Sequence, residues 1–467
     1  VLPAVQYLDE MGFVYCDFKP ENAMVEEDAV KLIDLGAVRM ADDTQSDVYG
    51  SKGYTAPEAH DAPTALSDLY SVARALAVLV ADFDFQGKYE GSLPPAAEVP
   101  AFAANDALYR LLTKATRQAP AARFQSASEL AAQLVGVLRH VQGAGEVPRI
   151  ESEVFEPDSD PGLQAGEHRG HDGIPRLKVD HDDAAAGVIL AAGGVGDPER
   201  RLQLFERALL QQPRSTELAL RRIDELVTLG RFGDAESALR AVRASGQADW
   251  RLAWYHGRAL LGQGKVQETL EAFRSILGEM PGELAPQQAV ARAYEAGGDL
   301  DEALRYYDAV SRADPGFTSA AFGLARCRER RGDRAGAAEA YRRVPATSAR
   351  YVAAQMALAR ALLHDASGAP PSFKDVKGAA EALDAVAGQL EGIELHELRA
   401  RVLLATARLA EAGFSTQERV LGVRVQARVL RRAAEEELRA CARMAGVESE
   451  RIRWVDEANR VRPVSWI

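Results

Sequence analysis

Cysteine is scarce in this 467-residue chain, which contains Cys16, Cys327 and Cys441 and no CxxC pair. This excludes a disulfide framework and a four-cysteine metal site, and it is typical of a protein of the reducing cytoplasm. Long apolar runs are absent as well. The most apolar one, residues 70–81, contains Arg74 and is too short to cross a bilayer. We therefore expect a cytoplasmic protein with no membrane span.

An excess of basic residues is also missing. The formal net charge is −13, whereas a general nucleic-acid binder needs a basic face. The acidic excess is largest just before the middle of the chain, where residues 151–200 hold 12 Asp and Glu but only 4 Lys and Arg. We expect no nucleic-acid partner.

The sequence does contain a clear change of pattern along the chain. Residues 1–142 alternate short β-like runs with helical ones, and residues 143–196 are rich in Gly, Pro and acidic residues, as linkers are. Within that linker, residues 174–179 ("IPRLKV") are a candidate for one short strand docked on a neighbour. From Pro198 onward the pattern is helical throughout.

A 34-residue period runs through the helical part. Glycine recurs at this interval, a small residue follows five positions later, and a large apolar residue comes four positions after that. The three columns are Gly230, Gly264, Gly298 and Gly332, then Ala235, Thr269, Ala303 and Ala337, then Leu239, Phe273, Tyr307 and Tyr341. Such columns predict helical hairpins of tetratricopeptide length, in which glycine turns the chain and the other two residues set the packing. Accidental glycine spacing in Ala-rich helices explains this less well, because the columns stay in phase.

The period predicts repeats over residues 197–349. After residue 349 the helices continue but the period is lost. We expect atypical helical repeats and a C-terminal cap over residues 350–467.

The stretch "DFKPEN" at residues 17–22 carries groups that phosphoryl transfer needs. Asp17 is placed to accept the proton of a hydroxyl nucleophile, Lys19 to meet the migrating phosphate, and Asn22 to offer a neutral oxygen to a hard cation. The following strand ends in Asp34 and a glycine, and "APE" stands at residues 56–58. Taken singly, these residues would be ordinary solvated turn residues, and it is their joint spacing that favours a site.

The order D-x-K-x-x-N, D-L-G and A-P-E resembles the C-terminal lobe of Ser/Thr protein kinases. Together with the repeats it is similar to the actinobacterial PknG-type kinases, a resemblance supported by "WRLAWYHGRALL", "MPGELAPQQAV", "SAAFGLARCRER" and "VDEANRVRP". The resemblance implies a mainly α fold. Residues 1–142 would be the C-terminal lobe of a kinase domain, with short β-hairpins, and an α-helical tetratricopeptide solenoid would follow the linker.

By resemblance, residues of the "DFKPEN" motif and Asp34 would have catalytic and binding roles. Asp17 would be the catalytic base and Lys19 the phosphate-contacting lysine. Asn22 and Asp34 would be the ligands of Mg²⁺, and with Lys19 they would bind ATP.

The resemblance gives three further residues structural roles. Glu58 would form an ion pair with Arg123, and Asp68 would be the buried aspartate that ties the catalytic loop to a central helix. Leu35 replaces the usual Phe of the D-F-G motif, and residues 50–58 would bind the substrate peptide.

Cys16 stands where many kinases carry the Arg of the H-R-D motif, which normally binds an activation-loop phosphate. We therefore expect activity that is independent of phosphorylation at Thr44, Ser46 or Ser51. A redox-sensing thiol is an alternative role for Cys16, but a small packing residue is favoured.

The nucleotide-clamping half of a kinase is missing from the sequence. No G-x-G-x-x-G motif occurs, since "GQGKVQ" and "GVGDPE" both fail at the third glycine, and no V-A-I-K strand precedes residue 14. We expect this chain to be an incomplete part of a longer kinase and to be inactive by itself.

By resemblance, the whole protein would be a non-specific serine/threonine protein kinase that uses ATP and Mg²⁺ on cytosolic proteins. Its substrates would include forkhead-associated regulators of glutamate and 2-oxoglutarate metabolism, and the tetratricopeptide groove would dock a peptide or a domain. The alternative is a non-catalytic repeat scaffold with a remnant kinase lobe. Retention of the base, the lysine and both metal ligands favours the kinase, because a scaffold has no chemical use for them.

Overall fold

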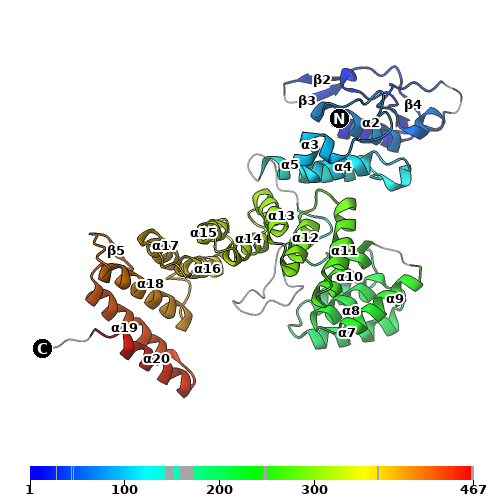
Figure 1. Ribbon diagram of the computed structural model, residues 1–467. Helices are drawn as coiled ribbons and strands as arrows, with labels where there is room; N and C mark the ends of the chain where they lie inside the picture. The colour runs from blue at the N-terminus through cyan, green and yellow to red at the C-terminus, as the bar shows by residue number, and fades with distance from the viewer. Residues whose placement is uncertain are drawn as a thin grey trace. The chain divides into compact units, whose positions relative to one another are not determined.

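The computed structural model describes residues 1–27, 29–43, 45, 47–143, 151–157, 173–246, 250–364 and 368–463 (Figure 1). The chain divides into two compact units. The first unit comprises Val1–Pro157, Arg176–Val290 and Arg312–Asp314, and the second comprises Asp158–Pro175, Ala291–Ser311 and Pro315–Ile467. Thr44 and Ser46 lie outside the described residues.

The amino-terminal part of the first unit is a small lobe of helices and two-stranded hairpins, blue to cyan in Figure 1. Strand β1 pairs antiparallel with β4, and β2 with β3. In chain order the elements are α1 (Leu2–Glu10), β1 (Phe13–Val14), η1 (Pro20–Asn22), β2 (Ala23–Glu26), β3 (Ala29–Leu32), β4 (Arg39–Met40), η2 (Pro57–His60), α2 (Ala65–Val80), η3 (Ala96–Glu98), α3 (Pro100–Ala104), α4 (Asp106–Ala115), η4 (Pro120–Ala122) and α5 (Ala127–Gln142). The predicted α lobe with short β-hairpins is confirmed.

Helix α2 lies at the centre of this lobe. Its side chains Leu69, Ala73 and Ala77 recur at four-residue spacing and are buried in one core with residues of α4 and α5. The apolar run at residues 70–81 is therefore a core helix, because its apolar face is covered by protein. Over the part of the chain that the structure describes, no helix has both the length and the apolar character needed to cross a membrane.

The lobe packs against the first repeats within the first unit. Lys114 of α4 donates to the backbone oxygen of Glu279 (2.9 Å), and Arg117, just after this helix, donates to the Glu279 carboxylate (2.8 Å). Helix α5 approaches the backbone of Gly282 closely at Gly136, where an added Cβ would lie 2.2 Å from the Gly282 oxygen. The two glycines allow a backbone-to-backbone approach that any side chain would prevent.

This junction contains a partly buried histidine, His140 on α5. Its Nε2 lies 2.8 Å from the amide nitrogen of Gln287, so the neutral ring accepts a hydrogen bond that protonation would remove. Burial, with a smaller contribution from Arg139, lowers the pKa of His140 to about 4.

We expect this histidine to make the first unit sensitive to acid. The unfolded state binds a proton near pH 6.5 and the folded state only near pH 4, so stability falls as the pH drops through that window, by about 1–2 kcal/mol at pH 5. Unfolding midpoints measured from pH 7 to pH 5 should show this loss, and His140→Gln should flatten it. The exposed His181, changed to Gln, serves as the control. An equal acid sensitivity in both variants would contradict the prediction.

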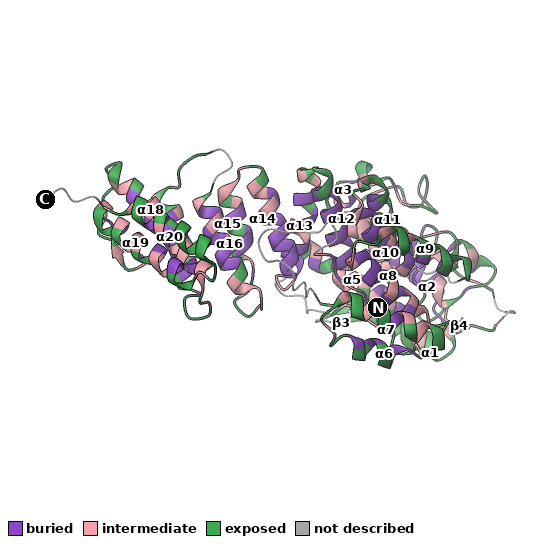
Figure 2. Cartoon of the chain, turned by 90° about the horizontal axis from the view of Figure 1, so that it is seen from below, coloured by how far each residue is buried: buried purple, intermediate pink, exposed green. Residues whose placement is uncertain are grey.

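Helices form most of the rest of the described chain, and Figure 2 shows how their buried residues gather on their facing sides. They are α6 (Ala186–Ala192), α7 (Pro198–Gln211), α8 (Thr216–Thr228), α9 (Phe232–Ala244), α10 (Trp250–Gly262), α11 (Val266–Glu279), α12 (Leu284–Gly297), α13 (Leu300–Ala313), α14 (Thr318–Arg330), α15 (Arg334–Arg342), α16 (Tyr351–Leu363), α17 (Phe373–Asp384), α18 (Ile393–Glu411), α19 (Ala427–Met444) and α20 (Glu448–Val461). A bridge between Phe155 and Leu177 and helix α6 lie inside the range expected to be linker.

The 34-residue columns have the expected physical roles. All four period glycines have a positive φ, between 72° and 82°, so each turns the chain where a Cβ would be strained. The large residue of the third column packs on a glycine of an adjacent helix: an added Cβ on Gly257 of the preceding helix would lie 2.6 Å from the Phe273 ring, and one on Gly323 of the following helix would lie 2.4 Å from the Tyr307 ring. The predicted helical hairpins are confirmed.

Buried ion pairs join successive repeats at the same 34-residue spacing. Glu217 of α8 pairs with Arg251 of α10, and Asp224 of α8 pairs with Arg258 of α10. Asp224 is 1% exposed, and its charge is balanced by arginines because an unpaired buried charge would be costly. The sequence shows this spacing, but only the structure shows that the pairs are buried.

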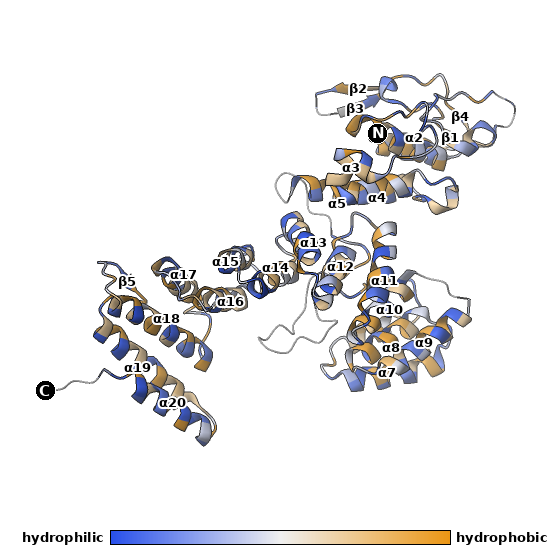
Figure 3. Ribbon diagram, in the orientation of Figure 1, coloured by the Kyte–Doolittle hydropathy of each residue, from blue (hydrophilic) through white to orange (hydrophobic). Residues whose placement is uncertain are grey.

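Helix pairing continues where the period is lost. Helix α16 packs on α17, α18 on α19, and α19 on α20. Helices α18 and α19 have 19 and 18 residues, compared with 13 in α10 and 14 in α11. A hairpin of β5 (Arg419–Val420) and β6 (Val423–Arg424) precedes α19. Figure 3 shows hydrophilic and hydrophobic residues on different sides of α19, as a helix with one solvated side requires.

Candidate active site

The loop after β1 is fixed by a buried carboxylate. Asp68 of α2 is 1% exposed, and its oxygens accept hydrogen bonds from the backbone N–H groups of Tyr15 (2.7 Å) and Cys16 (2.8 Å). Burial raises the pKa of Asp68 to about 6, against the opposing effect of the two backbone donors. The expected tie between this loop and a central helix is thus present in the geometry.

Cys16 adopts a strained backbone in this loop. Its φ is 71°, in a region that side chains with a Cβ rarely occupy. Its side chain is buried, and burial raises the pKa of the thiol to about 11. A thiol that stays protonated at neutral pH is a poor nucleophile. Its burial therefore favours a packing role for Cys16 over a redox role.

Asp17, Lys19, Asn22 and Ser51 form one hydrogen-bonded group. The carboxylate of Asp17 accepts bonds from Lys19 Nζ (2.9 Å) and from the Ser51 hydroxyl (2.7 Å). Lys19 also donates to Ser51 Oγ (2.8 Å), and the Asn22 amide donates to the backbone oxygen of Asp17 (2.8 Å). Three of these residues come from one short motif, whereas Ser51 is brought in from a distant segment.

The group keeps Asp17 ionised. Burial opposes ionisation, but hydrogen bonds from Ser51, Lys19 and Asn22 outweigh it, and the pKa of Asp17 lies below its usual value. An ionised carboxylate at a partly exposed position can accept a proton from a substrate hydroxyl.

Asn22 and Asp34 lie next to each other at one end of the β2–β3 hairpin. The register pairs Ala23 with Leu32, and the Ile33 N–H donates to the backbone oxygen of Asn22 (3.1 Å). The Tyr15 hydroxyl donates to the backbone oxygen of Asp34 (2.5 Å) and so links this end to the loop that carries Asp17. The two predicted metal ligands are thus brought together.

The donor set suits a magnesium ion that also binds phosphate. The Nδ2 of Asn22 is engaged with Asp17, which leaves its Oδ1 for a cation, and Asp34 adds an exposed carboxylate. Among the described residues no group of three or more His, Cys, Asp or Glu could hold a metal. Magnesium commonly takes only one or two protein ligands and completes its shell with water and phosphate oxygens.

Exposed apolar side chains share the hairpin face that carries Asn22. Met24 is 47% exposed and Ile33 is 53% exposed. Alternation along paired strands puts Asn22, Met24 and Ile33 on the same face. Sequence reasoning missed this surface, although an apolar residue two positions after a predicted metal ligand is a readable signal.

The "APE" segment is anchored to the lobe core by an ion pair. Both carboxylate oxygens of Glu58 accept bonds from the fully buried guanidinium of Arg123, at 2.6 and 2.8 Å. The Ser67 hydroxyl donates to Glu58 as well (2.9 Å), and Arg123 stacks on the Tyr70 ring. The predicted partners meet in a bidentate geometry that holds the segment rigidly.

A second buried arginine holds the same segment from its other end. Arg74 of α2 is fully buried and donates to the backbone oxygens of Gly53 (2.8 Å), Tyr89 (2.8 Å) and Ser92 (2.5 Å). It thereby ties residues 50–58 to the loop at residues 85–92. In the sequence Arg74 served only as a sign against a membrane span, and an arginine inside an apolar core helix is the signal that could have identified its role.

The structure changes the interpretation of Ser51. The sequence presents it with Thr44 and Ser46 as a phosphorylation candidate whose loss leaves activity intact. Its hydroxyl instead bonds Asp17 and Lys19, so replacing it would disturb the site for a reason unrelated to phosphorylation. Phosphorylation-independent activity itself stays a prediction.

Comparisons with known proteins agree with this geometry. The family model described as protein kinase domain matches residues 1–132, and the model described as protein kinase G tetratricopeptide repeat matches residues 172–465. The serine/threonine-protein kinase PknG of Mycobacterium leprae is 34% identical over 330 residues, which cover 64% of this chain and 43% of that protein. The protein of the same name from Mycolicibacterium smegmatis is 32% identical over 329 residues, with the same coverage of both chains.

The chain spans less than half the length of these curated relatives. Among solved structures, the C-terminal part of a tetratricopeptide repeat-containing protein from Cytophaga hutchinsonii covers 58% of this chain and 98% of its own, at 11% identity and a TM-score of 0.42. The second family model matches well over half of the chain and follows directly on a kinase-domain match. The chain therefore belongs to the protein kinase G tetratricopeptide repeat family.

Proposed function

We propose that this chain supplies the catalytic-loop half of a serine/threonine protein kinase active site. The observation that carries the proposal is the joint hydrogen bonding of Asp17, Lys19, Asn22 and Ser51. Such a group aligns a proton acceptor and a cation on one spot, which is what phosphoryl transfer requires of a protein. A lobe without catalytic use would gain nothing from this arrangement.

Each residue has a role that follows from its contacts. Asp17, ionised and fixed by Ser51, accepts the proton of the substrate hydroxyl, while Lys19 Nζ offsets negative charge on the transferred group. When bound, magnesium ATP supplies the phosphoryl group and the metal charge. Asn22 Oδ1 and the Asp34 carboxylate would hold the metal.

The apolar hairpin face supports a nucleotide as the donor. Met24 and Ile33 expose apolar side chains on the face that carries Asn22, which Lys31 shares, and an adenine ring would bury that apolar surface. ATP with Mg²⁺ is therefore the proposed cofactor pair.

Catalysis also needs a nucleotide-clamping lobe, which these 467 residues do not contain. No glycine-rich phosphate loop occurs in the sequence, and positioning of the β- and γ-phosphates depends on one. We infer that the chain alone transfers no phosphate. The proposed substrates are cytosolic proteins, including forkhead-associated regulators of glutamate and 2-oxoglutarate metabolism, with the repeats as a docking surface for the substrate or for the kinase itself.

A fusion protein tests the proposal. The nucleotide-binding lobe of the Mycobacterium leprae relative is joined in front of Val1, and this two-lobe fusion is compared with the 467-residue chain. Transfer of labelled phosphate from Mg-ATP to a forkhead-associated protein is expected from the fusion and not from the chain. A folded fusion that binds ATP but transfers nothing would favour a non-catalytic repeat scaffold instead.

Ser51 gives a finer test in the same fusion. Ser51→Ala is expected to lower kcat about tenfold with little change in the KM for ATP, because the Asp17 carboxylate loses a partner that orients it. Ser51→Thr keeps the hydroxyl and should retain most activity. Ser128→Ala, at an exposed position of the same lobe, is the control for general effects on the fold. Full activity of Ser51→Ala would show that the hydroxyl does not orient Asp17.

A further inference from the structure

The loop between α4 and α5 contacts both the "APE" segment of the lobe and the first repeats. It contains Arg123, whose guanidinium donates to the two carboxylate oxygens of Glu58 at 2.6 and 2.8 Å. It also contains Arg117, whose guanidinium donates to the two carboxylate oxygens of Glu279, the last residue of α11, at 3.2 and 2.8 Å. This loop therefore lies between a segment of the candidate site and a helix of the repeats.

The two arginines of this loop are hydrogen-bonded to the same short stretch of backbone. The Nε of Arg123 donates to the backbone oxygen of Arg117 (2.7 Å), and the guanidinium of Arg117 donates to the backbone oxygen of Ala122 (2.8 Å). The nitrogen of Arg117 that contacts Ala122 also contacts Glu279. The position of Arg117 therefore influences both the backbone next to Arg123 and an oxygen that the Arg123 side chain needs.

A buried lysine holds the end of α11 against the same loop. Lys114 is 7% exposed, and its ammonium group donates to the backbone oxygen of Glu279 (2.9 Å) and to the Glu129 carboxylate (3.2 Å). The ammonium group also lies 4.3 Å from the centre of the Phe124 ring, next to Arg123. A buried charge needs such partners, and one of them is a carbonyl at the negative end of a repeat helix.

The carboxylate of Glu279 stays ionised at this contact. Burial raises its pKa, but Arg117 and Lys114 outweigh that effect, and the pKa lies below its usual value. The side chain of Glu279 is 41% exposed and that of Arg117 is 34% exposed, so the carboxylate can be replaced without opening a cavity. A bidentate pair fixes the direction of the guanidinium as well as its distance.

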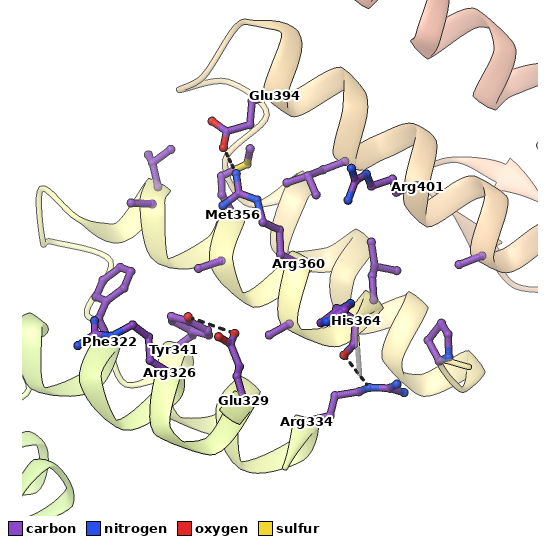
Figure 4. A pocket seen from close by; sticks show the side chains of 18 of the residues that line it. Phe322, Arg326, Glu329, Arg334, Tyr341, Met356, Arg360, His364, Glu394 and Arg401 are labelled. Atoms are coloured by element: carbon purple, nitrogen blue, oxygen red, sulfur yellow. Dashed lines mark hydrogen bonds and ion pairs between the residues drawn. The ribbon is translucent and has the colours of Figure 1, made fainter. Parts of the chain in front are cut away.

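Arginine–carboxylate pairs elsewhere in the repeats join one repeat helix to another. Figure 4 shows Arg360 of α16 reaching Glu394 of α18 beside a pocket of the second unit. Such a pair stabilises the repeats themselves. The pair of Arg117 and Glu279 differs, because its arginine belongs to the lobe and lies six residues before Arg123.

We propose that Glu279 is a positioning residue for residues 50–58, which it holds through Arg117, Arg123 and Glu58. The first repeats would then help to fix the segment that is expected to bind the substrate protein. The consequence for phosphoryl transfer rests on the proposed kinase function. The structural coupling does not, because it needs neither ATP nor a second lobe.

Hydrogen exchange of the 467-residue chain, followed by mass spectrometry without ATP, tests the coupling. Peptides spanning residues 53–62 report on the segment, whose backbone N–H groups bond to oxygens of Ala56 and Glu58. Glu279→Gln places an amide donor where one of the two accepting oxygens faced Arg117. Exchange at residues 53–62 should become about three- to tenfold faster, whereas peptides from the core of α2, residues 69–77, should exchange as in the parent.

Two further variants separate this effect from a general one. Glu271→Gln makes the same chemical change at an exposed position of α11 and should leave exchange at residues 53–62 within about twofold of the parent's. Arg117→Met should itself speed this exchange. In the Arg117→Met background Glu279→Gln should add nothing, because two substitutions that act through one contact are not additive.

The two-lobe fusion gives the functional readout. Glu279→Gln should lower kcat/KM for the forkhead-associated protein about threefold and leave the KM for ATP unchanged, because the segment contacts the protein substrate and not the nucleotide. A parent fusion that transfers no phosphate would count against the proposed function alone, since the exchange measurement on the chain still decides the coupling.

Three results would overturn the proposal. Parent-like exchange of residues 53–62 in Glu279→Gln would show that the repeats do not hold this segment. Equal acceleration at residues 69–77 would show a general loosening of the lobe. A further acceleration by Glu279→Gln in the Arg117→Met background would show that Arg117 does not carry the effect.

Discussion

Replacing Asp17 by asparagine is expected to lower phosphoryl transfer by the two-lobe fusion about a thousandfold. Asparagine has nearly the same shape and can still bond Ser51 and Lys19, which now surround the carboxylate at 2.7 and 2.9 Å. It cannot accept the proton of the substrate hydroxyl, and loss of a general base commonly costs between about 10² and 10⁴ in rate. The rate of labelled phosphate transfer at saturating Mg-ATP measures the effect.

The matched control is Asp42→Asn, the same chemical change at an exposed position of the same lobe. Its rate should stay within about twofold of the parent, and both variants should unfold at the parent's temperature. A rate for Asp17→Asn above a tenth of the parent's would show that the proton leaves by another route.

Replacing Asp224 by alanine is expected to destabilise the first unit by about 3–5 kcal/mol. Asp224 is fully enclosed between repeats, where its carboxylate pairs with Arg258 and lies 3.5 Å from Arg176. Removing the carboxylate leaves the arginine charge buried without its partner. Breaking a buried ion pair by removing one partner strongly destabilises the folded state. Urea unfolding followed by the fluorescence of Trp254, which lies on the helix that carries Arg258, reports the change.

An exposed pair provides the comparison. Asp234 contacts Arg231 at 2.8 Å on the surface of the same unit, and Asp234→Ala should cost less than about 1 kcal/mol. Arginines lower the pKa of Asp224 to about 2 despite its burial, so its contribution is complete above about pH 4 and is lost as the pH falls toward 2. Equal losses of stability from the two substitutions at pH 7 would show that burial of the ion pair does not increase its contribution to the free energy of unfolding.

The repeats could be predicted because their determinants are local and periodic. A glycine at Gly230, Gly264, Gly298 or Gly332 permits the positive φ of the turn without the strain that a Cβ would cause. The bridge at Leu177 falls within the candidate strand at residues 174–179, but its partner Phe155 could not be foreseen. Pairing between distant segments depends on tertiary contacts that leave no period in the sequence.

The candidate site also has one part that the sequence predicts and one part that only the structure shows. Asp17, Lys19 and Asn22 belong to one short motif, whose spacing by itself brings their side chains within hydrogen-bonding distance. Ser51 and Arg74 carry no such signal. A serine in a loop and an arginine in a helix are common, and only the packing of residues 50–58 on α2 gives these two a role.

The sequence by itself determined the family and the period of the repeats, and it predicted the base, the lysine and the metal ligands, because each is encoded within a few tens of residues. Only the tertiary structure decided that Ser51 holds Asp17 and that Asp224 is buried among arginines. It also decided that Glu279 of the repeats contacts Arg117 of the lobe. The burial of a residue and the charges around it depend on segments that lie far apart in the sequence. They are therefore fixed only when those segments pack together.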